Sequence, residues 1–227
     1  MEKVFKACDN AQQQYSGGDV PVPLTGTAKV SMAPLAWVDD TPLPQKHFIS
    51  GAVRSGDAEA EHWELISPAA LVAIAYEEIT IDNFTAKNCL EEFLETTFQF
   101  LGNSENESKI RCATLFLLFA LEAGDGTVEY DGVVGYADLP RKGLQGVARA
   151  CAEGAVKYSP YNWEKGMPCV EMIRHALRHV YLWLDGDREE DHLGHAAWNM
   201  FGALHSLDQW PGLNEGTMRT SGCTPPK

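Results

Sequence analysis

The sequence lacks any hydrophobic run long enough to cross a lipid bilayer. A transmembrane helix needs about 20 consecutive apolar residues, and the longest apolar run here covers only residues 115–121. The first residues, MEKVFKACDNAQQQ, also lack the apolar stretch that marks a secretory signal. We therefore expect a protein with no membrane partner that works in the cytoplasm.

Basic residues are also scarce. Lys and Arg number 18 against 32 Asp and Glu, which gives a formal net charge of −14. Proteins that bind duplex nucleic acid neutralise its phosphates with many Lys and Arg side chains, so the charge balance excludes duplex nucleic acid as a partner. A small anion remains open as a ligand, held by a few local cations or by a divalent metal.

The cysteines are few and scattered. The six of them include no C-x-x-C pair, which argues against a four-cysteine zinc site. Cys112 and Cys151 fall at apolar positions of helix-like segments. We therefore expect reduced thiols that fill the core, as in a cytoplasmic protein.

What the sequence does contain is helical periodicity. Hydrophobic residues make up 44% of the 227 residues, and after residue 62 they recur at three- and four-residue intervals. The predicted fold is mainly α, with a helical core of about six helices, an irregular or β-like N-terminal arm and a small hairpin that turns at Asp131-Gly132. The predicted helices span 68–78, 85–101, 108–123, 143–158, 168–184 and 190–207. We expect an N-terminal arm over 1–62, a helical domain over 63–207 with inserted helices at about 79–142, and a tail over 208–227.

The last two predicted helices carry most of the histidines. Glu171, His175 and His179 share one face of the first helix, and His192, His195 and Asn199 share one face of the second. The connection DGDREED is short enough to require an antiparallel hairpin. At about 1.5 Å per residue, His179 and His195 lie at similar distances from the turn, so the two faces are predicted to meet.

Such a meeting of imidazoles and carboxylates has two chemical uses. The groups can hold a divalent metal, Mg²⁺ or Mn²⁺, or they can activate water as a general base. The candidate metal ligands are His192, His195, Asp187 and Glu171. The candidate catalytic residues are His175, His179, His195 and Asp191. The alternative is structural: the histidines are hydrogen-bonded core residues, and Asp191 caps the second helix.

Two further groups of residues suit a nucleotide. The loop GAVKYSPYNWEKG, residues 154–166, offers aromatic rings that can stack a base and polar groups that can bind its edge. Nearby cations can bind phosphate. The candidate substrate-binding residues are Lys157, Tyr158, Asn162, Trp163, Lys165, Arg174, Arg178 and Asn199. The alternatives are an aromatic plug between two helices and ion pairing of the arginines at the surface.

A second acidic pattern lies upstream. Glu91, Glu92 and Glu95, followed by Glu122 and Asp125, match in spacing the carboxylates that hold Mg²⁺ in all-α nucleotide pyrophosphohydrolases. In those proteins the second motif begins an apolar helix, whereas here it ends one.

The loop, the strings RHALRH and HLGHAAWN, and the Gly–acid turn between them resemble the N-terminal domain of phage dATP/dGTP diphosphohydrolases, and the upstream string WELISPAAL is similar to that family's lead-in. The resemblance implies a phage origin and hence a host cytoplasm, a helical fold, and Mg²⁺-dependent hydrolysis of purine deoxynucleoside triphosphates to monophosphate and pyrophosphate. Two departures are an insertion of about 70 residues, 77–149, and a shorter turn without the family's Ser-Gly step. The matching signature residues are Gly154, Lys157, Tyr158, Asn162, Trp163, Gly166, Arg174, His175, His192, His195 and Asn199.

Three hypotheses follow. The first is a nucleotide hydrolase with a divalent metal and a small-molecule nucleotide as substrate. The second is a protein that binds a nucleotide or a nucleotide-derived host immune signal without turnover. The third is a structural helical protein, assembled as a homo-oligomer, in which the histidines only pack.

Overall fold

The computed structural model describes residues 45–47, 53–55 and 61–214, and the predicted mainly α class is confirmed. The two short strands of the N-terminal arm pair with each other, and the rest of the arm and most of the tail lie outside the described residues. The described elements are β1 (Gln45–His47), β2 (Val53–Ser55), α2 (Pro68–Ile74), β3 (Glu78–Thr85), α3 (Ala86–Gly102), α4 (Glu107–Ala123), β4 (Thr127–Val133), α5 (Arg141–Lys157), α6 (Cys169–Leu184) and α7 (His192–Gln209), with short 3₁₀ turns between them.

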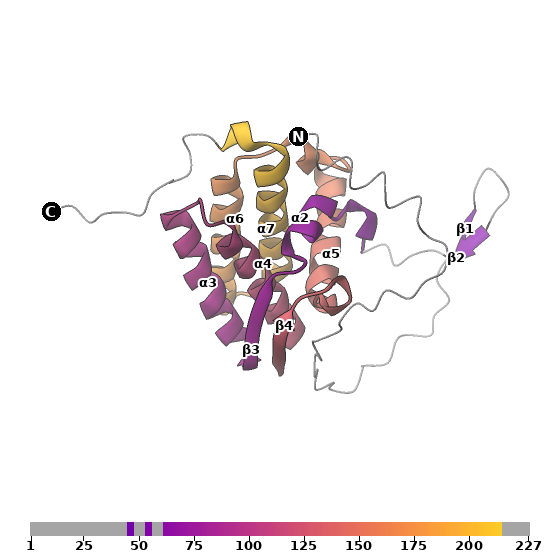
Figure 1. Cartoon of the computed structure of the whole chain (residues 1–227). Coiled ribbons are helices and arrows are strands. Elements are labelled where there is room, and N and C mark those ends of the chain that lie inside the picture. The colour runs from indigo at the N-terminus through magenta and orange to yellow at the C-terminus, as the bar shows by residue number, and fades with distance from the viewer. Residues whose placement is uncertain (1–44, 48–52, 56–60, 215–227) are drawn as a thin grey trace, which may run out of the picture.

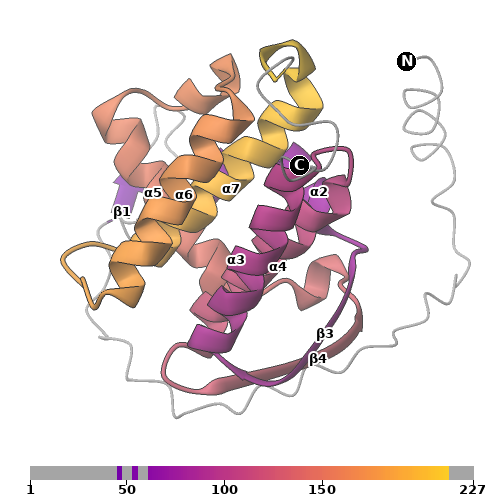
Figure 2. The same cartoon turned by 90° about the vertical axis from the view of Figure 1, so that its left-hand side faces the viewer.

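The helices form a bundle around α4 and α7 (Figure 1). α7 packs between α5 and α6 on one side and against α4 on the other, while α3 covers the far side of α4 (Figure 2). Residues 113–120 of α4 are all buried, which is the pattern of a helix surrounded by protein. The longest apolar run of the sequence is therefore a core helix.

The helix starts are set by local polar residues. The Ser67 hydroxyl accepts a hydrogen bond from the Ala70 amide at the start of α2, and Thr85 forms a reciprocal capping box with Asn88 at the start of α3. The Asp191 carboxylate caps α7 through the Gly194 amide. These caps satisfy amides that have no partner within their own helix.

A two-stranded antiparallel sheet is present as expected, but its strands differ from the predicted ones. β4 runs straight through Asp131-Gly132 and pairs with β3, so that Thr80 lies opposite Asp131. The predicted turn at this dipeptide is wrong, and residues 78–85 form a strand that the sequence did not predict. Ile79 and Ile81 bury alternate positions of β3, and this distant apolar strand outcompetes local pairing across Asp-Gly.

The cysteines among the described residues agree with the sequence. Cys89, Cys112, Cys151 and Cys169 are free, as predicted for reduced core thiols. Burial raises the pKa of Cys89, Cys151 and Cys169 to about 12, so these thiols are unreactive. Among the described residues, no helix has both the length and the apolar character that a membrane span requires.

Candidate functional site

The α6–α7 hairpin brings three of its histidines together. The rings of His192 and His195 lie 5.4 and 5.2 Å from the ring of His179, measured between centroids. The Nδ1 atoms of His179 and His192 are only 3.1 Å apart. The inward orientation predicted from the spacing along the two helices is therefore the one observed for these three residues.

Glu190, from the turn between the helices, joins these rings. Its Oε1 atom lies 3.1 Å from Nδ1 of His192 and 3.5 Å from Nδ1 of His179, and its Oε2 atom lies 3.6 Å from Nδ1 of His195. We call His179, Glu190, His192 and His195 the histidine cluster. Three imidazoles thus face one carboxylate, and the ring of His192 is almost fully buried.

Two more carboxylates flank the cluster. Asp187 Oδ1 lies 3.2 Å from Nε2 of His192, although the two groups are not aligned as a hydrogen bond. Glu153, from α5, lies 2.7 Å from Nε2 of His195. A hydrogen bond from the Glu189 amide, followed by the effect of His192, lowers the pKa of Asp187, so this carboxylate is ionised at neutral pH.

Burial keeps the imidazole of His179 neutral. Desolvation, reinforced by the neighbouring His195 and His192 and opposed by Glu190, lowers the pKa of His179 from 6.5 to about 4. Two imidazole Nδ1 atoms that approach to 3.1 Å repel through their lone pairs unless a proton or a cation lies between them. The cluster is therefore arranged either as a hydrogen-bonded histidine pair or as a cation site.

The donor geometry fits a divalent cation. Within the described residues, His179, Glu190 and His192 are the group whose ligand atoms all lie within 4.8 Å of one another. Adjacent ligands of an ion with bonds of about 2.1 Å are about 3.0 Å apart in an octahedron and about 3.4 Å in a tetrahedron. Two of the separations, both 3.1 Å, fall in this range, and the third, 3.5 Å, lies just above it.

A cavity of about 350 Å³ opens between α5, α6 and the loop that joins them. Trp163 is buried in its wall, with its ring set edge-on against the ring of His205 at 4.7 Å. Ser67 in turn contacts His205 Nδ1 at 3.2 Å. The predicted residues that line this cavity are Gly154, Tyr158, Asn162, Trp163, Glu171, His175 and Asn199.

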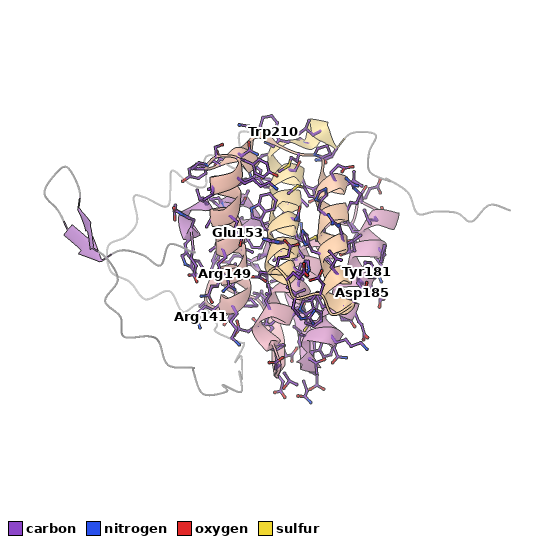
Figure 3. The ribbon with its side chains drawn as sticks, turned by 180° about the vertical axis from the view of Figure 1, so that it is seen from behind. Arg141, Arg149, Glu153, Tyr181, Asp185 and Trp210 are labelled. Carbon is purple, nitrogen blue, oxygen red and sulfur yellow. The ribbon has the colours of Figure 1, made fainter. Side chains whose placement is uncertain are left out.

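The cavity and the histidine cluster are adjacent parts of one face. Asn199 follows His195 by one turn of α7 and donates a hydrogen bond to its carbonyl oxygen at 2.8 Å. His175 precedes His179 by one turn of α6. α7 lies between α5 and α6 on this face (Figure 3), so the cavity and the cluster lie about one helical turn apart along α6 and α7.

The structure does not bring every predicted ligand to the cluster. Glu171 pairs with Arg174 and lines the cavity, two helical turns from His179. His175 is exposed at the cavity rather than among the other histidines. Asp191, predicted as catalytic, caps α7, which is the structural alternative considered for it. Its carboxylate also lies 3.4 Å from Arg149.

The predicted phosphate-binding cations are spread along the rim. Lys157 lies over the ring of Tyr158 at 5.2 Å, and Lys165 donates to the side-chain oxygen of Asn162 at 3.1 Å. Both lysines and Arg178 are exposed. Arg178 directly precedes His179 and contributes to the lowering of its pKa, but within the described residues no hydrogen bond or ion pair joins these three cations to the cluster.

Glu190 of the histidine cluster and Glu153 beside it are residues that the sequence did not single out. Glu190 stands two positions before His192 in a turn with several acids, so composition alone could not select it. Glu153 follows Arg149 by four residues on α5, and this shared helical face was the available signal. Figure 3 labels Arg149 and Glu153 on α5, beside α7.

The alternative acidic pattern is not assembled as a ligand group among the described residues. Glu122 instead accepts a hydrogen bond from the Lys142 amide at 2.8 Å and orients the start of α5. Asp125 lines a second cavity, which Glu190 and His192 of the cluster also line.

Comparison with known proteins bears on the same region. The family model described as dATP/dGTP diphosphohydrolase, N-terminal, matches residues 120–215. No curated protein and no solved structure matches the chain. The WELISPAAL segment lies outside the matched range, whereas the last part of the segment expected as an insertion, 120–142, lies inside it.

The matched range contains α5, α6 and α7, the aromatic loop and the whole histidine cluster. It therefore confirms the resemblance found in the strings between Gly154 and Asn199. Over residues 120–215 this chain is similar to the N-terminal region of dATP/dGTP diphosphohydrolases.

Proposed function

We propose that the protein hydrolyses purine deoxynucleoside triphosphates to the monophosphate and pyrophosphate with the help of a divalent metal. One observation carries the proposal. A cavity large enough for a nucleoside lies about one helical turn from a cluster of metal-binding groups, within the region that matches the family model.

The nucleoside occupies the cavity. Its volume of about 350 Å³ lies at the lower end of the range of small-molecule pockets, which suits a nucleoside better than a whole triphosphate. The aromatic rings of Tyr158, Tyr161 and Trp163 offer faces for a planar base. The side chains of Asn162 and Asn199 supply polar groups for its edge or for the sugar.

His179, Glu190 and His192 would hold the metal. When bound, it polarises a phosphate oxygen and lowers the pKa of coordinated water. Imidazole nitrogen is a ligand of the first-row transition metals, whereas Mg²⁺ takes oxygen ligands. Of the two ions that the sequence suggests, Mn²⁺ therefore fits this mixed set better than Mg²⁺.

The distance between cavity and cluster favours cleavage next to the sugar. His195 is one helical turn from Asn199 of the cavity, about 6 Å along the axis. The α-phosphate is attached directly to the sugar and is thus the phosphate nearest to the cluster. Water adds to the α-phosphorus, the bond to the bridging oxygen of the β-phosphate breaks, and pyrophosphate leaves.

His195 takes the proton from this water. Its ring contacts the ring of His179 but does not belong to the group that shares the metal. A base placed beside metal ligands but not bound to the metal is free to accept a proton. Glu190 lies close both to His192, a metal ligand, and to His195, the base, and so holds the two groups in position relative to each other.

A nucleotide-sequestering protein is the alternative outcome of the test. The groups around the cluster are mainly acidic, namely Glu153, Asp187, Glu190 and Asp191, with Arg149 as the cation in contact with them. Such a surface repels a free triphosphate. A non-catalytic protein with this site would therefore also need the metal to bind its ligand.

The test is turnover of each of the four deoxynucleoside triphosphates with Mn²⁺ or Mg²⁺, with products separated by chromatography. We expect dATP and dGTP to give monophosphate and pyrophosphate, faster with Mn²⁺. His195→Asn should abolish turnover, and His62→Asn, which alters a partly exposed histidine outside the cavity and the cluster, should not. Metal-dependent binding without products would refute hydrolysis, and neither binding nor products would refute the nucleotide site.

A further inference from the structure

We propose that Glu153 is a positioning residue that holds His195 in the tautomer with its proton on Nε2. The Nδ1 lone pair of His195 then points toward Glu190 and His179, the neighbouring members of the histidine cluster. The tautomer follows from geometry alone, and its effect on the reaction rests on the proposed function. Glu153 comes from α5, outside the hairpin that carries the cluster.

The hydrogen bond fixes which nitrogen carries the proton. Glu153 Oε2 lies 2.7 Å from Nε2 of His195, and an ionised carboxylate can only accept. Nε2 must therefore donate. The other ring nitrogen, Nδ1, lies 3.6 Å from Glu190 Oε2, too far for a hydrogen bond that would hold a proton there.

The packing of α5 against α7 puts Glu153 within reach. A Cβ atom on Gly146 of α5 would come within 3.2 Å of the Cα of Gly194 on α7, so the two helices meet almost backbone to backbone. One turn later on α5, Arg149 lies 3.4 Å from the carboxylate of Asp191. Glu153 follows by another turn, level with His195.

The orientation matters because only a lone pair can accept a proton. With the proton on Nε2, the Nδ1 lone pair faces Glu190 and His179, where the proposed metal and its water lie. In the opposite tautomer the lone pair would face the carboxylate of Glu153, and Nδ1 would donate rather than accept. Carboxylates that fix a histidine in this way typically change affinity or activity by about 10- to 100-fold.

A purely structural role would look different. Glu153 is 63% exposed at its side chain, and exposed pairs of this kind contribute little to stability. Removing the carboxylate should thus leave the fold and the melting temperature nearly unchanged. The tautomer of the His195 ring, by contrast, should change when the Glu153 carboxylate is removed.

The experiment measures that tautomer by NMR on the full-length protein with ¹⁵N-labelled histidine. The pH is set at about 8, above the ordinary imidazole pKa of roughly 6.5, and the His195 signals are assigned by their loss in His195→Asn. We expect wild type to show a protonated Nε2 and an unprotonated Nδ1. Glu153→Ala should give a mixture of tautomers, and Glu153→Gln, whose amide oxygen still accepts, an intermediate spectrum.

Kinetics complete the test. Glu153→Ala should lower kcat by about 10- to 100-fold and leave KM within about twofold, because Glu153 does not line the cavity. Glu105→Gln, an exposed carboxylate between α3 and α4, serves as the control and should behave as wild type. A protonated Nδ1 in wild type, or an unchanged tautomer in Glu153→Ala, would overturn the proposal.

The two proposals fail separately. If wild type turns over no nucleotide, the proposed function fails while the tautomer measurement still decides the role of Glu153. If wild type is active and Glu153→Ala is equally active, the positioning role fails and the proposed function stands.

Discussion

Mild acid should destabilise the protein through His179, and the substitution His179→Gln should remove most of that sensitivity. His179 is only 15% exposed at its side chain, and burial lowers its pKa from 6.5 to about 4. The unfolded chain therefore binds a proton at a pH where the folded protein still excludes it. This difference stabilises the folded state above about pH 6.5 and is lost as the pH falls toward 4.

The size of the effect follows from the pKa difference. Each unit corresponds to about 1.4 kcal/mol, so lowering the pKa from 6.5 to about 4 amounts to at most about 3 kcal/mol for His179. Domains of this size have a total stability of about 5–15 kcal/mol. The loss between neutral and acidic pH is therefore a large share of the whole.

Urea unfolding at a series of pH values measures it. At about pH 8 the side chain at position 179 is neutral in wild type and in His179→Gln. The difference in the free energy of unfolding between the two then reports only packing and hydrogen bonding around residue 179. That difference should shrink as the pH falls, by up to about 3 kcal/mol near pH 4. Parallel curves for wild type and His179→Gln would refute the idea that burial of a neutral imidazole makes the cluster acid-sensitive.

Three further predictions concern helix packing, capping and ligand binding. Gly143→Ala should destabilise the fold by about 1–3 kcal/mol in urea unfolding, since the new Cβ would lie 2.8 Å from the backbone of Leu118; an unchanged midpoint would mean that α4 and α5 separate freely. Ser67→Ala should cost about 1 kcal/mol because α2 loses its cap at the Ala70 amide, whereas Ser67→Asn should restore much of it. Arg149→Ala should weaken calorimetric binding of dGTP with Mn²⁺ by about 10- to 100-fold, because Arg149, 3.4 Å from Asp191 beside the cluster, is expected to make a charge-assisted contact to phosphate. Binding of the free nucleoside should not change, and an equal loss for nucleoside and nucleotide would place Arg149 outside the phosphate site.

Short-range patterns predicted much of the bundle. Ser67, Thr85 and Asp191 mark helix starts through bonds to amides three residues away, and such bonds depend only on neighbouring residues. The facing of His179 and His192 was also within reach, because helical spacing and a seven-residue connection determine which side chains meet.

Long-range packing decided the rest. The pairing of β3 with β4 depends on a strand about 50 residues away, and no local signal at Asp131-Gly132 reports it. Glu171 lies at the cavity and Glu190 at the cluster. This difference depends on the point along the chain at which α6 ends and the turn leads back into α7.

By itself, the sequence determined that this chain is a helical protein whose last hairpin turns its histidines inward, because periodicity and capping act within a few residues along the chain. The close approach of Gly146 to Gly194, and with it the position of Glu153 beside His195, was decided only by the tertiary structure. Which residue of one helix reaches a given residue of another depends on the crossing point of the two axes. Side chains from the whole core set that point together.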